Sequence, residues 1–158
     1  MAEILLTRID NRLIHGQVAT QWVRELGANQ VYVVNDETAK DELRKSLMNM
    51  AAPSGAKVVY LTVDELPEAL KNAADDDRIF MLVENPADAL RIVEEGVPLK
   101  EINVGNMHMC EGKRQVGQTV AIDDKDADVF KALQDKGSTL TIQRIPNAVK
   151  EDASQLTK

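Results

Sequence analysis

The run RIDNRLIHGQV, from Arg8 to Val18, brings together residue types that phosphate chemistry uses. His15 stands directly before Gly16, and both Arg12 and Asp10 precede it in the same run. A neutral imidazole can act as a nucleophile, a general base or a metal ligand. An arginine offers a planar fork of donors to phosphate oxygens, and an aspartate can hold the loop, the arginine or the ring in place. His15 is therefore the candidate reactive residue, and Arg12 and Asp10 are its candidate supports.

Signals for other reaction types are weak or missing. No G-x-S-x-G motif is present, which argues against acyl hydrolysis, and no glycine-rich nucleotide loop follows the first predicted strand, so we expect no ATP or NAD cofactor. His108 and Cys110 are the only tight pair of possible metal ligands, so no metal site is expected. A phosphoryl-accepting His15 remains. From residue types alone, a capping or solvated histidine and a surface ion pair between Arg12 and Asp10 also stay open.

Composition limits the class of protein. The chain has 158 residues, of which 44% are hydrophobic, and this suits one globular domain spanning 1–158. A formal net charge of −7 argues against nonspecific nucleic-acid binding. The single cysteine excludes an intrachain disulfide and is typical of a reducing cytosol, while the apolar start is too short for a signal peptide or membrane span. We expect a cytoplasmic protein that does not insert into the membrane.

The order of the apolar segments predicts the fold. Short β-branched runs alternate with segments of helical spacing, which indicates strands joined by crossover helices. We predict an α/β fold with an open, doubly wound, mostly parallel sheet flanked by helices on both faces, and a polar C-terminal end from about residue 147. The predicted strands are EILLTRI, QVYVV, KVVYL, RIFMLV, EINV and TLTIQ.

Apolar residues share a face in three predicted helices, and in the fifth helix these residues are Phe130 and Leu133. Val18, Trp22 and Leu26 do so in the first helix. The second helix has four such residues, which we expect to pack on the sheet: Ala39, Leu43, Leu47 and Met50.

The predicted fold places the histidine loop at a favourable edge. In open α/β sheets, ligands bind beyond the carboxyl ends of the strands, and the loop holding His15 follows the first strand. The backbone N–H groups of Gly16, Gln17 and Val18, at the start of the first helix, would point at an anion beside the imidazole. Nearby arginines would also favour the neutral ring that a nucleophilic attack requires.

Several further residues are candidates for the rim of this site. Asn35 and Asp36 end the second predicted strand at the same edge, although a turn with a helix cap is the simpler explanation for them. In the segment NVGNMHM, Gly105 would permit a tight turn, and Met107 could instead belong to the core. The full set of rim candidates is Arg8, Asn35, Asp36, Asn106, Met107 and His108.

Long stretches of the chain resemble a known family. The segments LLTRIDNRLIHGQV, ANQVYVVNDETAKD, EEGVPLKEINVGNMH and GKRQVGQTVAIDDKDADVFKALQDKGSTLTIQRIPN are similar to the mannose/fructose/sorbose family of enzyme IIB components of the bacterial sugar phosphotransferase system. The resemblance covers residues 4 to 147, and RIDxRLIHGQV is its most specific motif. NVGNMH, where NVGGM is commoner in the family, leans toward the N-acetylgalactosamine or galactosamine branch.

The resemblance implies a phosphocarrier role. His15 would take a phosphoryl group on Nδ1 from a phosphohistidine of the IIA protein and pass it to a sugar held in the membrane-embedded IIC and IID permease. Arg12 matches the family arginine that neutralises the phosphoryl group, and Asp10 matches the acidic position that supports it. The protein would then associate peripherally with the membrane permease. A nonenzymatic α/β module that binds an anionic metabolite at the first helix start is the alternative from a different class.

Overall fold

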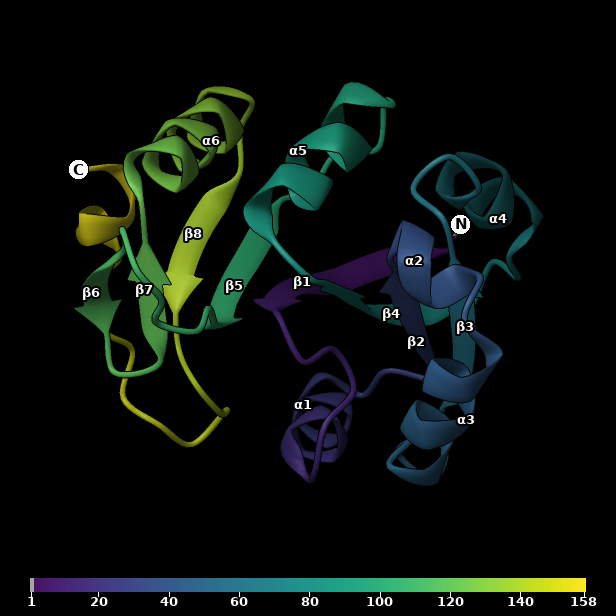
Figure 1. Ribbon diagram of the computed structural model, residues 1–158. Helices are drawn as coiled ribbons and strands as arrows, with labels where there is room; N and C mark the ends of the chain where they lie inside the picture. Colours follow the sequence, from purple (N-terminus) through teal and green to yellow (C-terminus); the bar gives the residue numbers. More distant parts are fainter. Residues whose placement is uncertain (1) are drawn as a thin grey trace.

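The computed structural model describes residues 2–158 and has a six-stranded parallel sheet at its centre (Figure 1). The strand order is β3-β2-β4-β1-β5-β8, and every neighbouring pair in it is parallel. All six predicted strands are present, which confirms the α/β fold class. Their bounds are Glu3–Asp10 (β1), Gln30–Val34 (β2), Lys57–Leu61 (β3), Arg78–Val83 (β4), Glu101–Asn106 (β5) and Thr139–Ile142 (β8).

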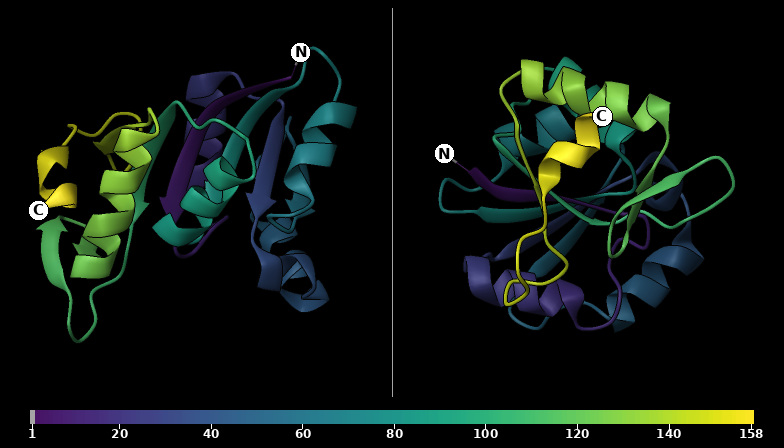
Figure 2. Two further views of the ribbon diagram at one scale, coloured as in Figure 1. Left: turned by 90° about the horizontal axis from the view of Figure 1, so that it is seen from above. Right: turned by 90° about the vertical axis from the view of Figure 1, so that its left-hand side faces the viewer.

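Helices cover both faces of the sheet, as predicted, and the two further views show these layers (Figure 2). One face packs against α4 (Leu66–Asn72), α5 (Pro86–Glu94) and α6 (Asp124–Asp135) through a large apolar cluster. The other face packs against α1 (Val18–Leu26) and α3 (Glu42–Met50), where Trp22 and Met48 are buried. The four inner strands, β2, β4, β1 and β5, are mostly buried, which explains their nearly continuous apolar sequences, whereas the edge strands β3 and β8 are partly exposed.

The second predicted helix is wrong in its extent and in its buried face. The segment forms two helices, α2 (Asp36–Ala39) and α3, because the Asp41 side chain accepts a hydrogen bond from the Arg44 amide and begins a new helix. Met48 therefore faces the sheet. The residues expected to do so are mostly exposed, with exposed fractions of 72% for Leu43, 60% for Leu47 and 85% for Met50.

The C-terminal third contains a hairpin that the sequence patterns did not predict. Strands β6 (Arg114–Gly117) and β7 (Val120–Ile122) pair antiparallel, outside the main sheet. The polar C-terminal end forms a 3-10 helix (Ala153–Thr157) that lies beside α6 (Figure 2). Leu156 of this helix is fully buried, which anchors the end of the chain. Within residues 2–158, no helix has both the length and the apolar character needed to cross a bilayer.

The topology makes the carboxyl end of β1 a switch point. The chain leaves β1 through α1 toward β2 and β3, returns to β4, and then passes β1 to reach β5 and β8. The helices that follow β1 and β4, α1 and α5, accordingly lie on opposite faces. Loops that follow β1 and β5 are adjacent, since Asp10 at the end of β1 pairs in register with Asn106 at the end of β5. This is where ligands bind in open α/β sheets, and the loop carrying His15 lies there.

Candidate functional site

The site is built around the carboxylate of Asp10, the last residue of β1. Its side chain is 1% exposed. Oδ1 accepts hydrogen bonds from the backbone amide and the Nε of Arg12, both at 3.0 Å. Oδ2 accepts from Nη2 of Arg12 at 3.1 Å and from Nη2 of Arg8 at 3.3 Å. The predicted Arg12–Asp10 pair is therefore present, but it is a partly buried, multiply bonded pair and not a surface bridge.

Arg12 connects this carboxylate to the candidate reactive histidine. Its Nη1 lies 2.9 Å from Nε2 of His15. Because a guanidinium only donates, Nε2 must accept, and the proton of the neutral ring is then on Nδ1. Nδ1 of His15 is buried, and among residues 2–158 it has no hydrogen-bond partner. The ring as a whole is half-buried.

Both burial and charge keep the histidine neutral. Burial lowers the pKa of His15 below its ordinary value, and the positive charge of Arg12 lowers this pKa further. The Asp10 carboxylate acts in the opposite direction and Arg8 in the same direction, each more weakly. The expectation that nearby arginines favour the unprotonated ring agrees with this result.

The loop between β1 and α1 has a tightly specified backbone. Leu13 adopts a left-handed conformation with φ 60°, which costs a non-glycine residue about 1 kcal/mol or more. Its side chain is 2% exposed and packs among apolar residues of the α1 layer, and its amide donates to the Asp10 carbonyl. Burial of this side chain therefore offsets the strain and fixes the path of the loop toward His15.

The three amides predicted to bind an anion are not equivalent. The Val18 amide donates to the His15 carbonyl at 3.3 Å, so in this conformation it is occupied and that prediction is corrected. The amides of Gly16 and Gln17 make no hydrogen bond within residues 2–158. Both residues are exposed, and Gly16 has a φ of 51° that suits glycine. Two free donors thus directly follow His15 in the chain.

Arg8 is close to the site but does not form its rim. It is 0% exposed and lies beneath Asp10. Its Nη1 donates to Oδ1 of Asn103 at 2.7 Å and to the Gln143 carbonyl at 3.1 Å, and the guanidinium lies 5.7 Å from the centre of the Trp22 ring. Burial lowers the pKa of Arg8 to about 10, partly opposed by Asp10, so the group stays charged at neutral pH. Arg8 was a candidate for the rim, but its side chain is covered and does not line the surface of the site.

Asn35 and Asp36 lie two strands away, at the end of β2. Asn35 caps α2 by accepting the Thr38 amide through its side-chain oxygen, which is the simpler of the two explanations from the sequence. Asp36 accepts from the Val63 amide at 2.9 Å and from Arg91 at 3.0 Å. The structure brings neither residue into contact with the His15 loop.

The segment after β5 holds the loop through a residue that the sequence analysis missed. Asn11 lies in the loop, and its side chain is hydrogen-bonded to Nδ2 of Asn106 and, at 2.9 Å, to Nδ1 of His108. The Asn11 amide donates to the Asn106 carbonyl at 3.1 Å. Asn106 and His108 therefore lie at the edge of the site and support the loop. The signal for Asn11 was its place inside the RIDNRLIHGQV motif, between two charged residues that were singled out.

Met107 takes one of its two predicted roles, and Gly105 differs from its predicted role. Met107 is 6% exposed and belongs to the core, and its backbone bonds to Thr119 and Ala121 join β7 to the main sheet. Gly105 is inside β5 and makes no tight turn. A Cβ at this position would collide with the guanidinium of Arg8, so the glycine is required for space.

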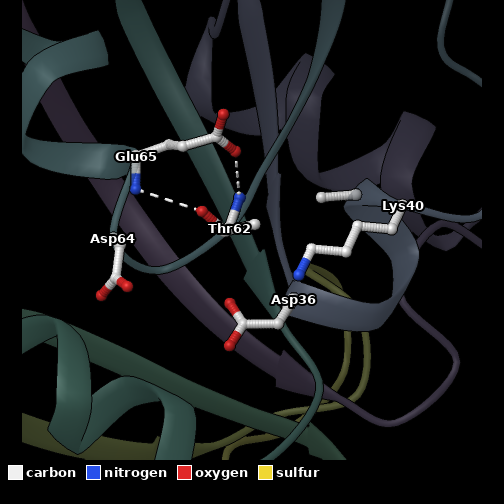
Figure 3. A pocket seen from close by; sticks show the side chains of 6 residues that line it. Asp36, Lys40, Thr62, Asp64 and Glu65 are labelled. Atoms are coloured by element: carbon white, nitrogen blue, oxygen red, sulfur yellow. Dashed lines mark hydrogen bonds between the residues drawn. The ribbon is translucent and has the colours of Figure 1, made fainter.

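A separate pocket of about 430 Å³ lies near the ends of β2 and β3 (Figure 3). It is lined by Asp36, Ala39, Lys40, Thr62, Asp64 and Glu65. Figure 3 shows reciprocal hydrogen bonds between Thr62 and Glu65, the capping pattern at the start of α4. No residue of the His15 loop lines this pocket. Two of its carboxylates, those of Asp36 and Glu65, already accept hydrogen bonds from backbone amides.

Comparison with known proteins identifies the family. The family model for the PTS system sorbose subfamily IIB component matches residues 4–158. The chain is 42% identical over 156 residues to the N-acetylgalactosamine-specific phosphotransferase enzyme IIB component 2 of Escherichia coli K12, covering 99% of each chain. It is also 40% identical over 141 residues to the mannose-specific EIIAB component of that strain, covering 89% of this chain and 44% of that protein. The crystal structure of the N-acetylgalactosamine-specific IIB component 1 from Escherichia coli superposes with a TM-score of 0.91 at 38% identity, covering 95% of this chain and 99% of that one. The chain therefore belongs to the sorbose subfamily of IIB components, which take part in phosphoryl transfer in sugar phosphotransferase systems.

Proposed function

We propose that His15 carries the phosphoryl group, receiving it from a phosphohistidine of a IIA protein and passing it to a sugar bound in a IIC/IID permease. The contact between Arg12 and Nε2 of His15 carries this proposal. It places a charged donor, held by a buried carboxylate, beside a neutral imidazole. Phosphoryl transfer depends mainly on such positioning and charge stabilisation, because the transition state spreads negative charge over three oxygens.

The first transfer balances when one proton moves between the two rings. A ring nitrogen of His15 attacks phosphorus while the phosphorus–nitrogen bond of the donor histidine breaks. The donor imidazole takes up a proton as it leaves, and the His15 ring gives up the proton on its other nitrogen. In the second transfer, the sugar hydroxyl oxygen attacks phosphorus, the bond to His15 breaks, and the hydroxyl proton passes to the imidazole.

The reactive nitrogen determines how the site must move. The family resemblance implies Nδ1, yet in this structure Nδ1 is covered and Nε2 accepts from Arg12. Attack by Nδ1 therefore requires the Arg12 contact to break, the ring to turn and its proton to be on Nε2. Release from the ring frees Nη1 of Arg12 for the phosphoryl oxygens. The free amides of Gly16 and Gln17 supply two further donors.

The comparisons also support the proposed partners. The mannose-specific relative is named as an EIIAB component, which unites the IIA and IIB parts in one protein and supports a IIA donor for this chain. The relative at 42% identity is named for N-acetylgalactosamine, and we propose an amino sugar as the final acceptor. The sugar would bind in the permease, with this chain docking peripherally at the membrane.

Phosphorylation of the purified chain tests the assignment of His15. The protein is incubated with phosphoenolpyruvate, the general phosphotransferase proteins and IIA, and we expect an acid-labile, base-stable phosphoryl adduct. His15→Ala abolishes this adduct, whereas in His108→Ala the adduct still forms, even though a contact of the His15 loop is lost. Equal labelling of His15→Ala would overturn the assignment. A folded wild type that binds phosphate but takes no label from its cognate IIA would favour the nonenzymatic binding module.

Two further measurements test the finer parts of the proposal. Phosphorus and nitrogen NMR of the labelled protein identify the substituted ring nitrogen, with Nδ1 as the expected result. Reconstitution with IIC/IID permeases and a panel of amino sugars and hexoses identifies the acceptor. Faster transfer to mannose or fructose than to any amino sugar would refute the amino-sugar assignment and leave the role of His15 intact.

A further inference from the structure

A fully buried guanidinium lies directly under the site. Arg8 is 0% exposed, and burial of a charged group is costly unless its partners compensate. Its terminal nitrogens have three acceptors: Oδ1 of Asn103 at 2.7 Å, the Gln143 carbonyl at 3.1 Å and Oδ2 of Asp10 at 3.3 Å. An apolar side chain of similar volume would fill this position with less electrostatic cost. The charge therefore calls for a reason beyond packing.

The neighbouring strand is shaped to admit this guanidinium. Gly105, in β5, would carry a Cβ that overlaps the terminal atoms of Arg8. Its backbone is outside the left-handed region, so conformational freedom does not explain the glycine. Asn103, on the same strand, is fixed by a hydrogen bond from its Nδ2 to the Gln143 carbonyl at 3.1 Å. Three segments, β1, β5 and the chain after β8, thus enclose one cationic group.

We propose that Arg8 is a positioning residue for phosphoryl transfer, holding the Asp10 carboxylate so that Arg12 reaches His15, and that Gly105 provides the space this requires. The inference rests on the proposed role of His15. Arg8 acts on His15 through the side chains of Asp10 and Arg12 and does not itself contact the histidine.

The Asp10 carboxylate, which both arginines bind, links the buried Arg8 to the outer Arg12. Arg8 binds one oxygen of Asp10 from inside the protein. Arg12 uses its amide, Nε and Nη2 on the same carboxylate, which leaves Nη1 directed at His15. Without the inner partner, the carboxylate is free to turn about its side-chain bonds, and the outer guanidinium turns with it. A displacement of a reacting group by about 1 Å can cost about a hundredfold in rate.

Three variants test the proposal. Arg8→Met removes the charge and keeps an unbranched side chain of similar length. Arg8→Lys keeps the charge but has one donor nitrogen in place of the guanidinium, and Gly105→Ala forces the guanidinium to move. The matched controls are Gly117→Ala, where an added Cβ meets its nearest atoms at 3.3 Å, and Arg114→Met, whose charge is on the surface. Arg8→Lys retains the buried charge, so the test stands even where Arg8→Met does not fold.

The decisive measurement is single-turnover phosphorylation of folded variants at increasing concentrations of phosphorylated IIA. We expect the saturating rate to fall by about 10- to 100-fold in Gly105→Ala and Arg8→Met, with half-saturation unchanged, because orientation is lost and docking is not. Arg8→Lys recovers part of the loss. A purely structural role would change the melting temperature without changing the saturating rate of the folded protein.

The outcomes separate this inference from the proposed function. No label on wild-type His15 would refute the proposed function itself. Normal labelling of the wild type together with control-like saturating rates in folded Gly105→Ala and Arg8→Lys would overturn the positioning role alone. Slowed rates in both, with Gly117→Ala and Arg114→Met unaffected, support it.

Discussion

Replacement of Asp10 by asparagine tests the central contact of the site. Asp10→Asn keeps the shape of the side chain and one acceptor oxygen but removes the negative charge. It also places an amide donor where one oxygen accepts from Arg8 or Arg12. Two cations then face each other across a neutral group, and one of them, Arg8, is completely buried.

The expected loss of stability follows from the burial of each partner. Breaking a buried ion pair by removal of one partner costs about 3–5 kcal/mol. The Arg12 side chain is 33% exposed, so water solvates most of its charge once the carboxylate is lost. Exposed ion pairs contribute only about 0–1 kcal/mol to stability. The remaining loss comes from Arg8, which keeps Asn103 and the Gln143 carbonyl as acceptors. We therefore expect a decrease of about 3 kcal/mol in the free energy of unfolding, at the lower end of the buried range.

Urea denaturation followed by circular dichroism measures this loss. The midpoint should fall while the dependence of the unfolding free energy on urea stays constant, since the same surface is exposed. Asp124→Asn is the matched control, because Asp124 is 97% exposed in its pair with Arg114, and its effect should stay within about 0.5 kcal/mol. An Asp10→Asn variant as stable as this control would refute the view that Asp10 compensates the buried charge.

Three other perturbations give separate tests. The pH at which the rate of His15 phosphorylation has fallen by half should lie below the ordinary pKa of histidine, because burial and Arg12 lower the pKa of His15. Arg12→Gln, measured in the same stopped-flow series, should shift this fall to higher pH, since it removes a cation that lowers this pKa. Leu47→Gln should change the free energy of unfolding by less than about 0.5 kcal/mol because Leu47 is exposed, whereas Met48→Ala should lower it by about 2–5 kcal/mol because Met48 is buried. Equal losses in urea titrations would contradict the observed orientation of α3. Asn11→Ala removes the side-chain hydrogen bonds of the His15 loop to Asn106 and His108, so amide hydrogen exchange in the loop should become faster and labelling of His15 slower. Unchanged exchange would show that these bonds do not hold the loop.

The sheet could be predicted from the sequence because its strands carry a strong local signal. A parallel strand is buried on both faces, so a run such as RIFMLV is apolar throughout and stands out from its surroundings. The segment holding α2 and α3 lacks that clarity. Its apolar residues repeat with helical spacing, but the helix cap at Asp41 divides them, and capping depends on a single side chain rather than on a periodic pattern. Strands β6 and β7 are too short to produce an alternation at all.

The same difference separates the predicted and the missed residues of the site. Asp10, Arg12 and His15 lie within one short run, so local spacing was enough to bring them together. Apart from Asp10, the hydrogen-bond partners of Arg8 lie far along the chain, Asn103 at a separation of 95 and Gln143 at 135. Only the strand order places β1 beside β5 and near the end of β8. A local pattern carries no information on that order.

The charges at the end of β1 grade from the interior to the surface, and this gradation suits a phosphocarrier. Exposure of the side chains rises from 0% at Arg8 to 1% at Asp10 and 33% at Arg12. The inner two charges neutralise each other, so the net positive charge of the group is at Arg12, on a protein whose formal net charge is −7. Such a local cation attracts a phosphoryl group without attracting anions to the rest of the surface. While no phosphoryl group is bound, the Arg12 guanidinium donates a hydrogen bond to Nε2 of His15. This acceptor is uncharged, so the bond breaks at modest free-energy cost. A carboxylate in that position would hold Arg12 more strongly and would repel the incoming phosphoryl oxygens, so a neutral imidazole is the better resting partner for Arg12 in the proposed phosphoryl transfer.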